Sequence, residues 1–168
     1  MPKLTAEKLR EKMAGIDLIA MDVDGVLTDG RITISSDGSE SKNFNVRDGH
    51  GLAVARFKGY KLAWISGRVS EATILRAREL GIEHVFQGHR KKDEILKELA
   101  EKLGVALEQV LFIGDDVVDI PAMKAAGVGV AVADAHPKAL AQADWVTLSA
   151  GGEGAVREII DLIVETRS

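Results

Sequence analysis

The chain has 168 residues, a formal net charge of −4 and a sequence pI of about 5.6. Its length suits one domain over residues 1–168 with one sizeable hydrophobic core. The acidic balance argues against general electrostatic binding of nucleic acid, and the absence of cysteine excludes disulfides and thiolate metal sites.

The N-terminal stretch MPKLTAEKLREKMAG is charged and amphipathic. It lacks the apolar centre of a signal peptide. No segment of the sequence approaches the ~20 apolar residues that a membrane-spanning helix needs. We therefore expect a cytoplasmic protein without a membrane partner.

Short apolar runs then alternate with amphipathic segments along the chain. The runs are mostly rich in β-branched residues, which is typical of buried parallel strands. They cover residues 17–21, 62–65, 84–86, 110–113, 128–132 and 145–148. Helices are expected at about 49–58, 70–80, 92–103, 117–126, 137–142 and 154–164. This alternation predicts an α/β fold with a doubly wound, Rossmann-like parallel sheet and helices on both faces.

Residues 31–46 interrupt the alternation. Apolar and polar residues alternate here on both sides of an Asp37-Gly38 turn. The pattern predicts a small β-hairpin inserted after the first strand. Asp48 follows the hairpin and is a candidate N-cap for the next helix.

Polar side chains gather where the predicted strands end. In a doubly wound sheet, ligands bind outside the carboxyl ends of the strands, so these side chains are expected to converge. In chain order they are Asp22 and Asp24 after the first strand, Ser66 after the second, Lys92 after the third, and Asp115, Asp116 and Asp119 after the fourth.

Phosphoryl transfer is the chemistry that needs this set. One carboxylate can attack phosphorus, and a second can protonate the leaving oxygen and then activate water. Crowded carboxylates need a cation, and oxygen ligands without cysteine favour Mg²⁺ over Zn²⁺. A hydroxyl, an ammonium group and backbone N–H groups can hold the phosphoryl oxygens.

Four motifs, DVDGVLTDG, the serine of WISGR, a lysine that opens a helix, and GDDVVD, resemble those of the haloacid dehalogenase superfamily. The resemblance implies that Asp22 is the nucleophile and Asp24 the general acid/base. It implies that Ser66 and Lys92 bind the phosphoryl group, although Lys91 could compete for the second role. Mg²⁺ would be held by the Asp22 carboxylate, the Asp24 backbone carbonyl and Asp115, with support from Asp116 and Asp119.

Further stretches resemble the 3-deoxy-D-manno-octulosonate 8-phosphate (KDO 8-phosphate) phosphatases. They are FNVRDGHG, VAVADAHP, ADWVT and GGEGAVREI, and the similarity runs from about Ile16 to Val164. The resemblance implies hydrolysis of this sugar acid phosphate through an aspartyl-phosphate, in lipopolysaccharide biosynthesis. The substrate contacts that it implies are Asp24, Asn45, Val46, Arg47, Asp48, Gly49, Arg68, Arg76 and Lys92.

The chain has no room for a separate cap domain over the site. The resembled family closes its sites as a homotetramer, in which hairpins and C-terminal tails lie over neighbouring sites, and the same assembly is expected here. One departure concerns Glu153, which stands where relatives often have arginine. A negative charge at this position could change how the tail meets an anionic substrate.

Three alternatives stay open at the level of sequence. The substrate could be another sugar acid phosphate, such as a nine-carbon nonulosonate 9-phosphate. The chain could be a phosphoacceptor signalling domain, although Asp24 supplies an acid/base that such receivers lack. It could also be a non-catalytic module.

His50 and His89 lie near the expected mouth of the site. They are therefore candidates for substrate contact, although weaker ones than the residues above.

Overall fold

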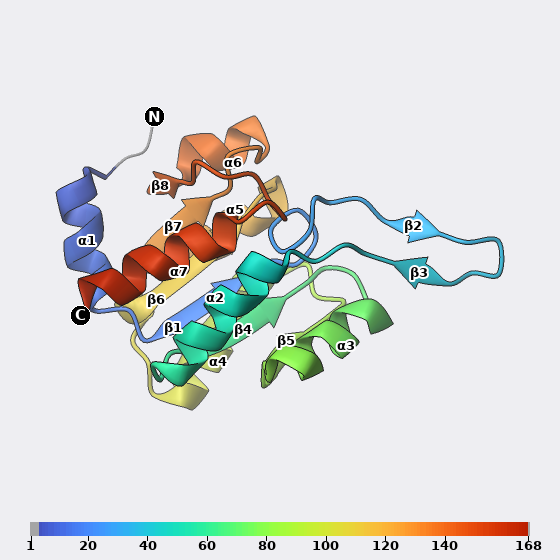
Figure 1. Ribbon diagram of the computed structural model, residues 1–168. Coiled ribbons are helices and arrows are strands. Elements are labelled where there is room, and N and C mark those ends of the chain that lie inside the picture. The colour runs from blue at the N-terminus through green and yellow to red at the C-terminus, as the bar shows by residue number, and fades with distance from the viewer. Residues whose placement is uncertain (1–3, 168) are drawn as a thin grey trace.

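The computed structural model describes residues 4–167, and a six-stranded sheet with the order β5-β4-β1-β6-β7-β8 forms its centre (Figure 1). Every neighbouring pair in this sheet is parallel. The strands are β1 (Leu18–Met21), β4 (Lys61–Ile65), β5 (His84–Phe86), β6 (Val110–Gly114), β7 (Val128–Ala131) and β8 (Trp145–Val146). The predicted doubly wound α/β architecture is confirmed.

Helices cover both faces of the sheet. Helices α2 and α7 pack against each other on one face, and α4 and α5 pack together on the other (Figure 1). The α-helices are α1 (Ala6–Ala14), α2 (Val46–Phe57), α3 (Glu71–Leu80), α4 (Lys92–Leu103), α5 (Ile120–Ala125), α6 (Pro137–Gln142) and α7 (Ala155–Thr166), with short 3₁₀ helices η1 (Leu107–Gln109) and η2 (Val117–Asp119). Among the described residues, none of these helices is long and apolar enough to cross a membrane.

The core lies along the two central strands. Every residue of β1 and of β6 is buried, because helices cover both faces of a parallel sheet. This explains why these strands are continuous apolar runs rather than alternating ones. Strand β1 pairs with both β4 and β6, so the residues that follow these three strands emerge side by side at one edge of the sheet.

The hairpin projects from the body of the protein beyond this edge (Figure 1). Its two strands, β2 (Thr33–Ile34) and β3 (Glu40–Ser41), are antiparallel and much shorter than the predicted segment. Asp37 accepts a hydrogen bond from the Ser39 N–H at the turn, and Gly38 has φ +86°. The insertion is therefore confirmed as a small hairpin with a tight turn.

The predicted helix boundary near Asp48 is wrong. Helix α2 begins at Val46, because the side chain of Asn45 accepts a hydrogen bond from the Arg47 N–H at 2.8 Å and caps the helix. Asp48 is buried and instead accepts a hydrogen bond from the Arg157 N–H at 2.8 Å. It thereby joins α2 to the first turn of α7, which a local capping pattern cannot reveal.

Two further boundaries differ from the sequence prediction. Residues 117–126 form the 3₁₀ helix η2 followed by α5, with Pro121 in the first turn of α5. Strand β8 ends at Val146, and Leu148 beyond it is exposed. Both differences lie at the ends of elements, where local sequence preference is weakest.

Candidate active site

Asp22 leaves the central strand β1 at the carboxyl edge of the sheet. Its backbone N–H donates to the Ile113 carbonyl at 3.0 Å, which ties it to β6. Its side chain is buried, and Oδ1 accepts a hydrogen bond from the Val23 N–H at 2.7 Å. The same oxygen lies 2.8 Å from Nζ of Lys92. The sheet thus presents one oriented carboxylate beside one ammonium group.

Lys92 is the first residue of α4 and its side chain is buried. Nζ donates to Oδ1 of Asp119 at 2.6 Å in addition to its contact with Asp22. Lys91 instead forms an exposed ion pair with Glu94 at 2.9 Å. The structure therefore brings Lys92 into the carboxylate cluster and leaves Lys91 on the surface.

Three carboxylates meet at this point. Asp22, Asp115 and Asp119 offer oxygens that lie within 4.8 Å of one another, a spacing that suits a metal ion. Oδ1 of Asp115 is buried and accepts no hydrogen bond from the described residues. Oxygen ligands and an unpartnered anionic atom fit a hard divalent cation such as Mg²⁺.

Asp119 holds the loop of Asp115 and Asp116 in place through hydrogen bonds to its backbone. Its Oδ2 accepts hydrogen bonds from the backbone N–H groups of Asp115 at 2.9 Å and Asp116 at 3.2 Å. Asp116 itself is exposed and accepts from the Val117 N–H at 2.6 Å, which caps η2. Asp116 therefore shapes the loop, while Asp119 holds both that loop and Lys92.

The carboxylates of Asp22, Asp115 and Asp119 repel one another when no cation lies among them. Burial, with the Asp119 charge, raises the pKa of Asp22 to about 6 although Lys92 opposes the shift. Burial and the charges of Asp22 and Asp119 raise the pKa of Asp115 to about 9. Burial alone would lower the pKa of Lys92, but the two neighbouring carboxylates outweigh it and the net shift is upward. A bound cation would relieve this repulsion.

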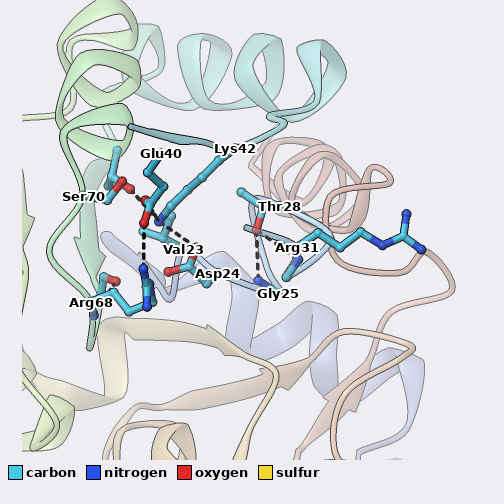
Figure 2. A network of polar contacts seen from close by, with 12 residues as sticks. Val23, Asp24, Gly25, Thr28, Arg31, Glu40, Lys42, Arg68 and Ser70 are labelled. Atoms are coloured by element: carbon cyan, nitrogen blue, oxygen red, sulfur yellow. Dashed lines mark hydrogen bonds and ion pairs between the residues drawn. The ribbon is translucent and has the colours of Figure 1, made fainter. Parts of the chain in front are cut away.

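Asp24 lies in the turn that follows Asp22. Neither of its buried carboxylate oxygens accepts a hydrogen bond from the described residues, but Oδ1 lies 2.7 Å from Nζ of Lys42 (Figure 2). The turn depends on Gly25, which has φ +91°. A Cβ on Gly25 would lie 2.1 Å from Oδ2 of Asp115, so only glycine lets the two loops approach this closely.

Ser66 is the first residue after β4 and is buried. Its N–H donates to the Phe86 carbonyl at 2.8 Å, and its hydroxyl accepts a hydrogen bond from the Arg68 N–H at 3.2 Å. Because β4 lies beside β1 in the sheet, Ser66 emerges at the same edge as Asp22. The hydroxyl is therefore available on the predicted phosphoryl side of the site.

The three arginines predicted to contact substrate have different environments. Arg47 is exposed on the first turn of α2. Arg68 is also exposed, and its Nη2 donates to Oε2 of Glu40 at 2.7 Å (Figure 2). Arg76 is half-buried, pairs with Glu79 at 2.7 Å, and its guanidinium lies 6.0 Å from the centre of the Phe44 ring.

The segment Asn45–Gly49 is held by the protein itself. Nδ2 of Asn45 donates to the Gly152 carbonyl at 2.9 Å, and Asp48 bonds to α7. Val46 is 77% exposed. Gly49 lies against Arg76, where a Cβ would lie 2.3 Å from Nη2. The segment is thus positioned jointly by α7 and by the arginine on α3.

Two residues escaped the sequence analysis. Glu40 lies on β3 and Lys42 just after it, and the Lys42 ammonium contacts both Glu40 and Asp24 of the catalytic loop (Figure 2). Their only signal in the sequence is the charged ESK stretch in a hairpin, which looks like a solvated edge. The weaker candidates His50 and His89 are both exposed.

Comparisons with known proteins agree with this geometry. A family model described as haloacid dehalogenase-like hydrolase matches residues 65–160. The 3-deoxy-D-manno-octulosonate 8-phosphate phosphatase KdsC of Escherichia coli K12 is 46% identical over 153 residues, which covers 91% of this chain and 81% of that protein.

Solved structures show the same relationship. The KDO 8-phosphate phosphatase of Moraxella catarrhalis, in complex with magnesium, phosphate and KDO, is 42% identical and has a TM-score of 0.95, covering 97% of this chain and 94% of that one. The cobalt-bound form of the Haemophilus influenzae phosphatase is 39% identical with a TM-score of 0.90, covering 93% and 91%.

Proposed function

Since the chain belongs to the haloacid dehalogenase-like hydrolases, in the branch of the KDO 8-phosphate phosphatases, we propose that it hydrolyses KDO 8-phosphate to KDO and phosphate. The observation that carries this proposal is the meeting of Asp22, Lys92 and Asp115 at the carboxyl edge of the sheet, with Asp24 in the adjoining turn. The reaction makes the chain a metal-dependent phosphoric monoester hydrolase of the KDO pathway.

We assign the first chemical step to Asp22. One of its carboxylate oxygens forms a bond to phosphorus while the bond between phosphorus and the C8 oxygen of the sugar acid breaks. Asp24 gives its proton to the departing oxygen. Lys92 and the Ser66 hydroxyl hold the phosphoryl oxygens as charge develops on them.

The second step returns the enzyme to its starting state. Asp24, now ionised, takes a proton from a water molecule as that water attacks the phosphorus of the aspartyl-phosphate. The bond between phosphorus and Asp22 breaks, which releases inorganic phosphate and restores the carboxylate. Asp24 regains the proton that it gave up in the first step.

Mg²⁺ fits the site, and the Asp22 carboxylate, the Asp24 backbone carbonyl and Asp115 are the groups that we propose hold it. When bound, the ion neutralises negative charge on the phosphoryl group and on the carboxylates around it. Asp119 and Asp116 keep the Asp115 loop in place through the backbone contacts described above.

We propose that the exposed Arg47 and Arg68 meet the carboxylate of the sugar acid, because guanidinium groups bind carboxylates in a bidentate manner. The half-buried Arg76 would contact the substrate from the wall of the site, where it already packs against Phe44 and Gly49. Asn45 and Asp48 would fix the segment through Gly152 and α7, and Val46 and Gly49 would line it.

We further propose a cytoplasmic homotetramer in which hairpins and C-terminal tails lie over neighbouring sites. The support is the projecting hairpin, whose Ile34 is 70% exposed, together with exposed Val46 near the site. Burial of such residues is a common driving force for association. Light scattering after size-exclusion chromatography would give the mass of a tetramer, and a monomer mass would contradict this part.

The experiment that tests the activity compares phosphate release from KDO 8-phosphate and from a nonulosonate 9-phosphate, with Mg²⁺ and with EDTA. We expect kcat/KM at least tenfold higher for KDO 8-phosphate, and no turnover in EDTA. A clear preference for the nonulosonate would instead favour the second candidate. The exposed Glu153 is the feature that could favour it, since the charge of the tail is changed there.

A further inference from the structure

Lys42 is a buried cation on an otherwise exposed hairpin. Its side chain is 0% exposed, although it follows a strand of only two residues. Helix α3 and the turn after β1 enclose its ammonium group, which lies 2.7 Å from Oδ1 of Asp24 and 3.3 Å from Oγ1 of Thr73. A lysine gives up its hydration in this way only where partners compensate the charge.

The contact is equally consequential for Asp24. Its two carboxylate oxygens are buried without hydrogen bonds from the described residues, so the Lys42 ammonium is the ion-pair partner that offsets their charge. A short carboxylate in a turn can rotate about its side-chain torsions unless something holds it. The general acid/base must stay within hydrogen-bond reach of the leaving oxygen to work.

Glu40 extends this contact toward the substrate side. Its Oε1 lies 3.8 Å from the Lys42 ammonium, and its Oε2 accepts from Arg68 at 2.7 Å. A hydrogen bond with the Ser70 side chain, together with Arg68 and Lys42, lowers the pKa of Glu40. The chain Asp24, Lys42, Glu40 and Arg68 therefore alternates negative and positive charge from the catalytic turn to an exposed guanidinium (Figure 2).

We propose that Lys42 is a positioning residue that holds the Asp24 carboxyl group within reach of the leaving oxygen, and that Glu40 aligns Lys42 with Arg68. The inference rests on the proposed function and assigns a role in that same site to the hairpin. The hairpin then serves its own active site by orienting the acid/base, whatever contacts its tip makes elsewhere.

A double-mutant cycle separates this role from simple support of the hairpin. If Lys42 acts through Asp24, Lys42→Met should lower kcat for KDO 8-phosphate by about 10²-fold, the usual scale of general acid/base catalysis. The same change in an Asp24→Asn background should lower kcat by less than threefold further, because residues that act as a unit are not additive. Multiplicative losses in the double variant would overturn the proposal.

The dependence on the leaving group gives an independent readout. p-Nitrophenolate departs without a proton from the enzyme, whereas an alkoxide needs one. In the first turnover, Lys42→Met should slow alcohol release from KDO 8-phosphate by about 10²-fold and release of p-nitrophenolate by less than fivefold. Equal losses with the two substrates would show that Lys42 only supports the fold, and the proposal would fail.

Matched variants control for charge and for folding. Lys97→Met removes an exposed ammonium that pairs with Asp93 on α4 and should leave turnover unchanged. Lys42→Arg keeps the charge and should recover at least part of the loss. If Lys42→Met does not fold, Lys42→Gln takes its place as single variant and in the Asp24→Asn background, because the coupling is defined only when both single variants are measured. A wild-type protein without phosphatase activity would instead count against the proposed function.

Discussion

The carboxyl edge of the sheet and the hairpin contribute to one site in opposite ways. Asp22 directly follows strand β1, Lys92 begins helix α4, and the side chains of both residues are buried. Glu40 and Lys42 belong to a thin, projecting insertion whose strands have two residues each. On our proposal, the groups that carry the phosphoryl chemistry lie at the end of the buried sheet, whereas groups that orient the acid/base and meet the substrate belong to the hairpin and the loops beside it.

The difference also follows from burial. Every residue of β1 and β6 is packed on both sides, so Asp22 and Asp115 cannot shift without disturbing the core. The hairpin has few buried contacts apart from Lys42, and such segments open at lower free energy than core strands. Substitutions at the carboxyl end of the sheet should therefore nearly abolish turnover, whereas substitutions in the hairpin should change kcat or KM by smaller factors.

The largest effect is expected at the nucleophile. Asp22→Asn keeps the size of the side chain but removes the attacking carboxylate, so kcat should fall on the order of 10⁴-fold or more. Phosphate release from KDO 8-phosphate measures it. Turnover within tenfold of wild type would contradict the covalent mechanism and with it the division between sheet and hairpin.

Lys92 should rank next. Lys92→Met removes the ammonium shared by Asp22 and Asp119, and loss of one preorganised charge of this kind costs about 10²- to 10³-fold in kcat. The matched control is Lys91→Met, which removes only the exposed pair with Glu94 and should change kcat by less than twofold. Equal losses in both variants would show that general charge, rather than position, matters.

A smaller effect is expected at Arg68, which lies after β4 and pairs with Glu40 of the hairpin. Arg68→Ala should raise KM for KDO 8-phosphate about tenfold or more, because a carboxylate contact is lost, while kcat/KM for p-nitrophenyl phosphate changes little. Steady-state kinetics with the two substrates measure this split. A similar loss with both substrates would show that Arg68 acts in the phosphoryl-transfer step, and it would contradict the distinction between the sheet and the hairpin.

The smallest effect concerns the stability of the metal-free protein. The pKa of Asp115 lies at about 9 when folded and 3.8 in the reference state, so the folded protein holds a proton that the unfolded chain releases. The contribution of Asp115 to the free energy of unfolding is therefore fully present below about pH 4, and it is lost as the pH rises to about 9.

Thermal melts in EDTA at several pH values measure this trend. We expect Tm to fall by a few degrees from pH 6 to pH 9, and Mg²⁺ to recover more at the higher pH. Asp115→Asn, which cannot ionise, should flatten the profile. A wild-type profile that rises over this range would contradict the carboxylate crowding at the sheet edge.

The sheet edge was accessible from the sequence because its signals are local. Asp22 and Ser66 directly follow an apolar run, Asp115 follows one after a single glycine, and the topology of a parallel sheet brings such positions together. Lys92 opens a helix with a strong amphipathic pattern, so its bounds were predicted correctly as 92–103. The preference for Lys92 over Lys91 came instead from the resembled family, in which the spacing from the glycine of QGHRKK indicates Lys92.

The hairpin side was not accessible because its signals are long-range. Lys42 pairs with Asp24 across a turn, and in the sequence it looks like one more charge on an exposed edge strand. Asp48 has the side chain of a local cap but bonds to Arg157, 109 positions later. Contacts of this kind depend on tertiary packing, and no pattern of neighbouring residues encodes them.

The most direct test of the account is to identify the residue that carries the phosphoryl group. Asp24→Asn should slow hydrolysis of the intermediate, so rapid acid quenching with KDO 8-phosphate should trap one phosphoryl group per chain. Peptide mass spectrometry should place that group on Asp22. A phosphoryl group on any other residue, or turnover of wild type without a trapped species in any variant, would contradict Asp22 as the nucleophile.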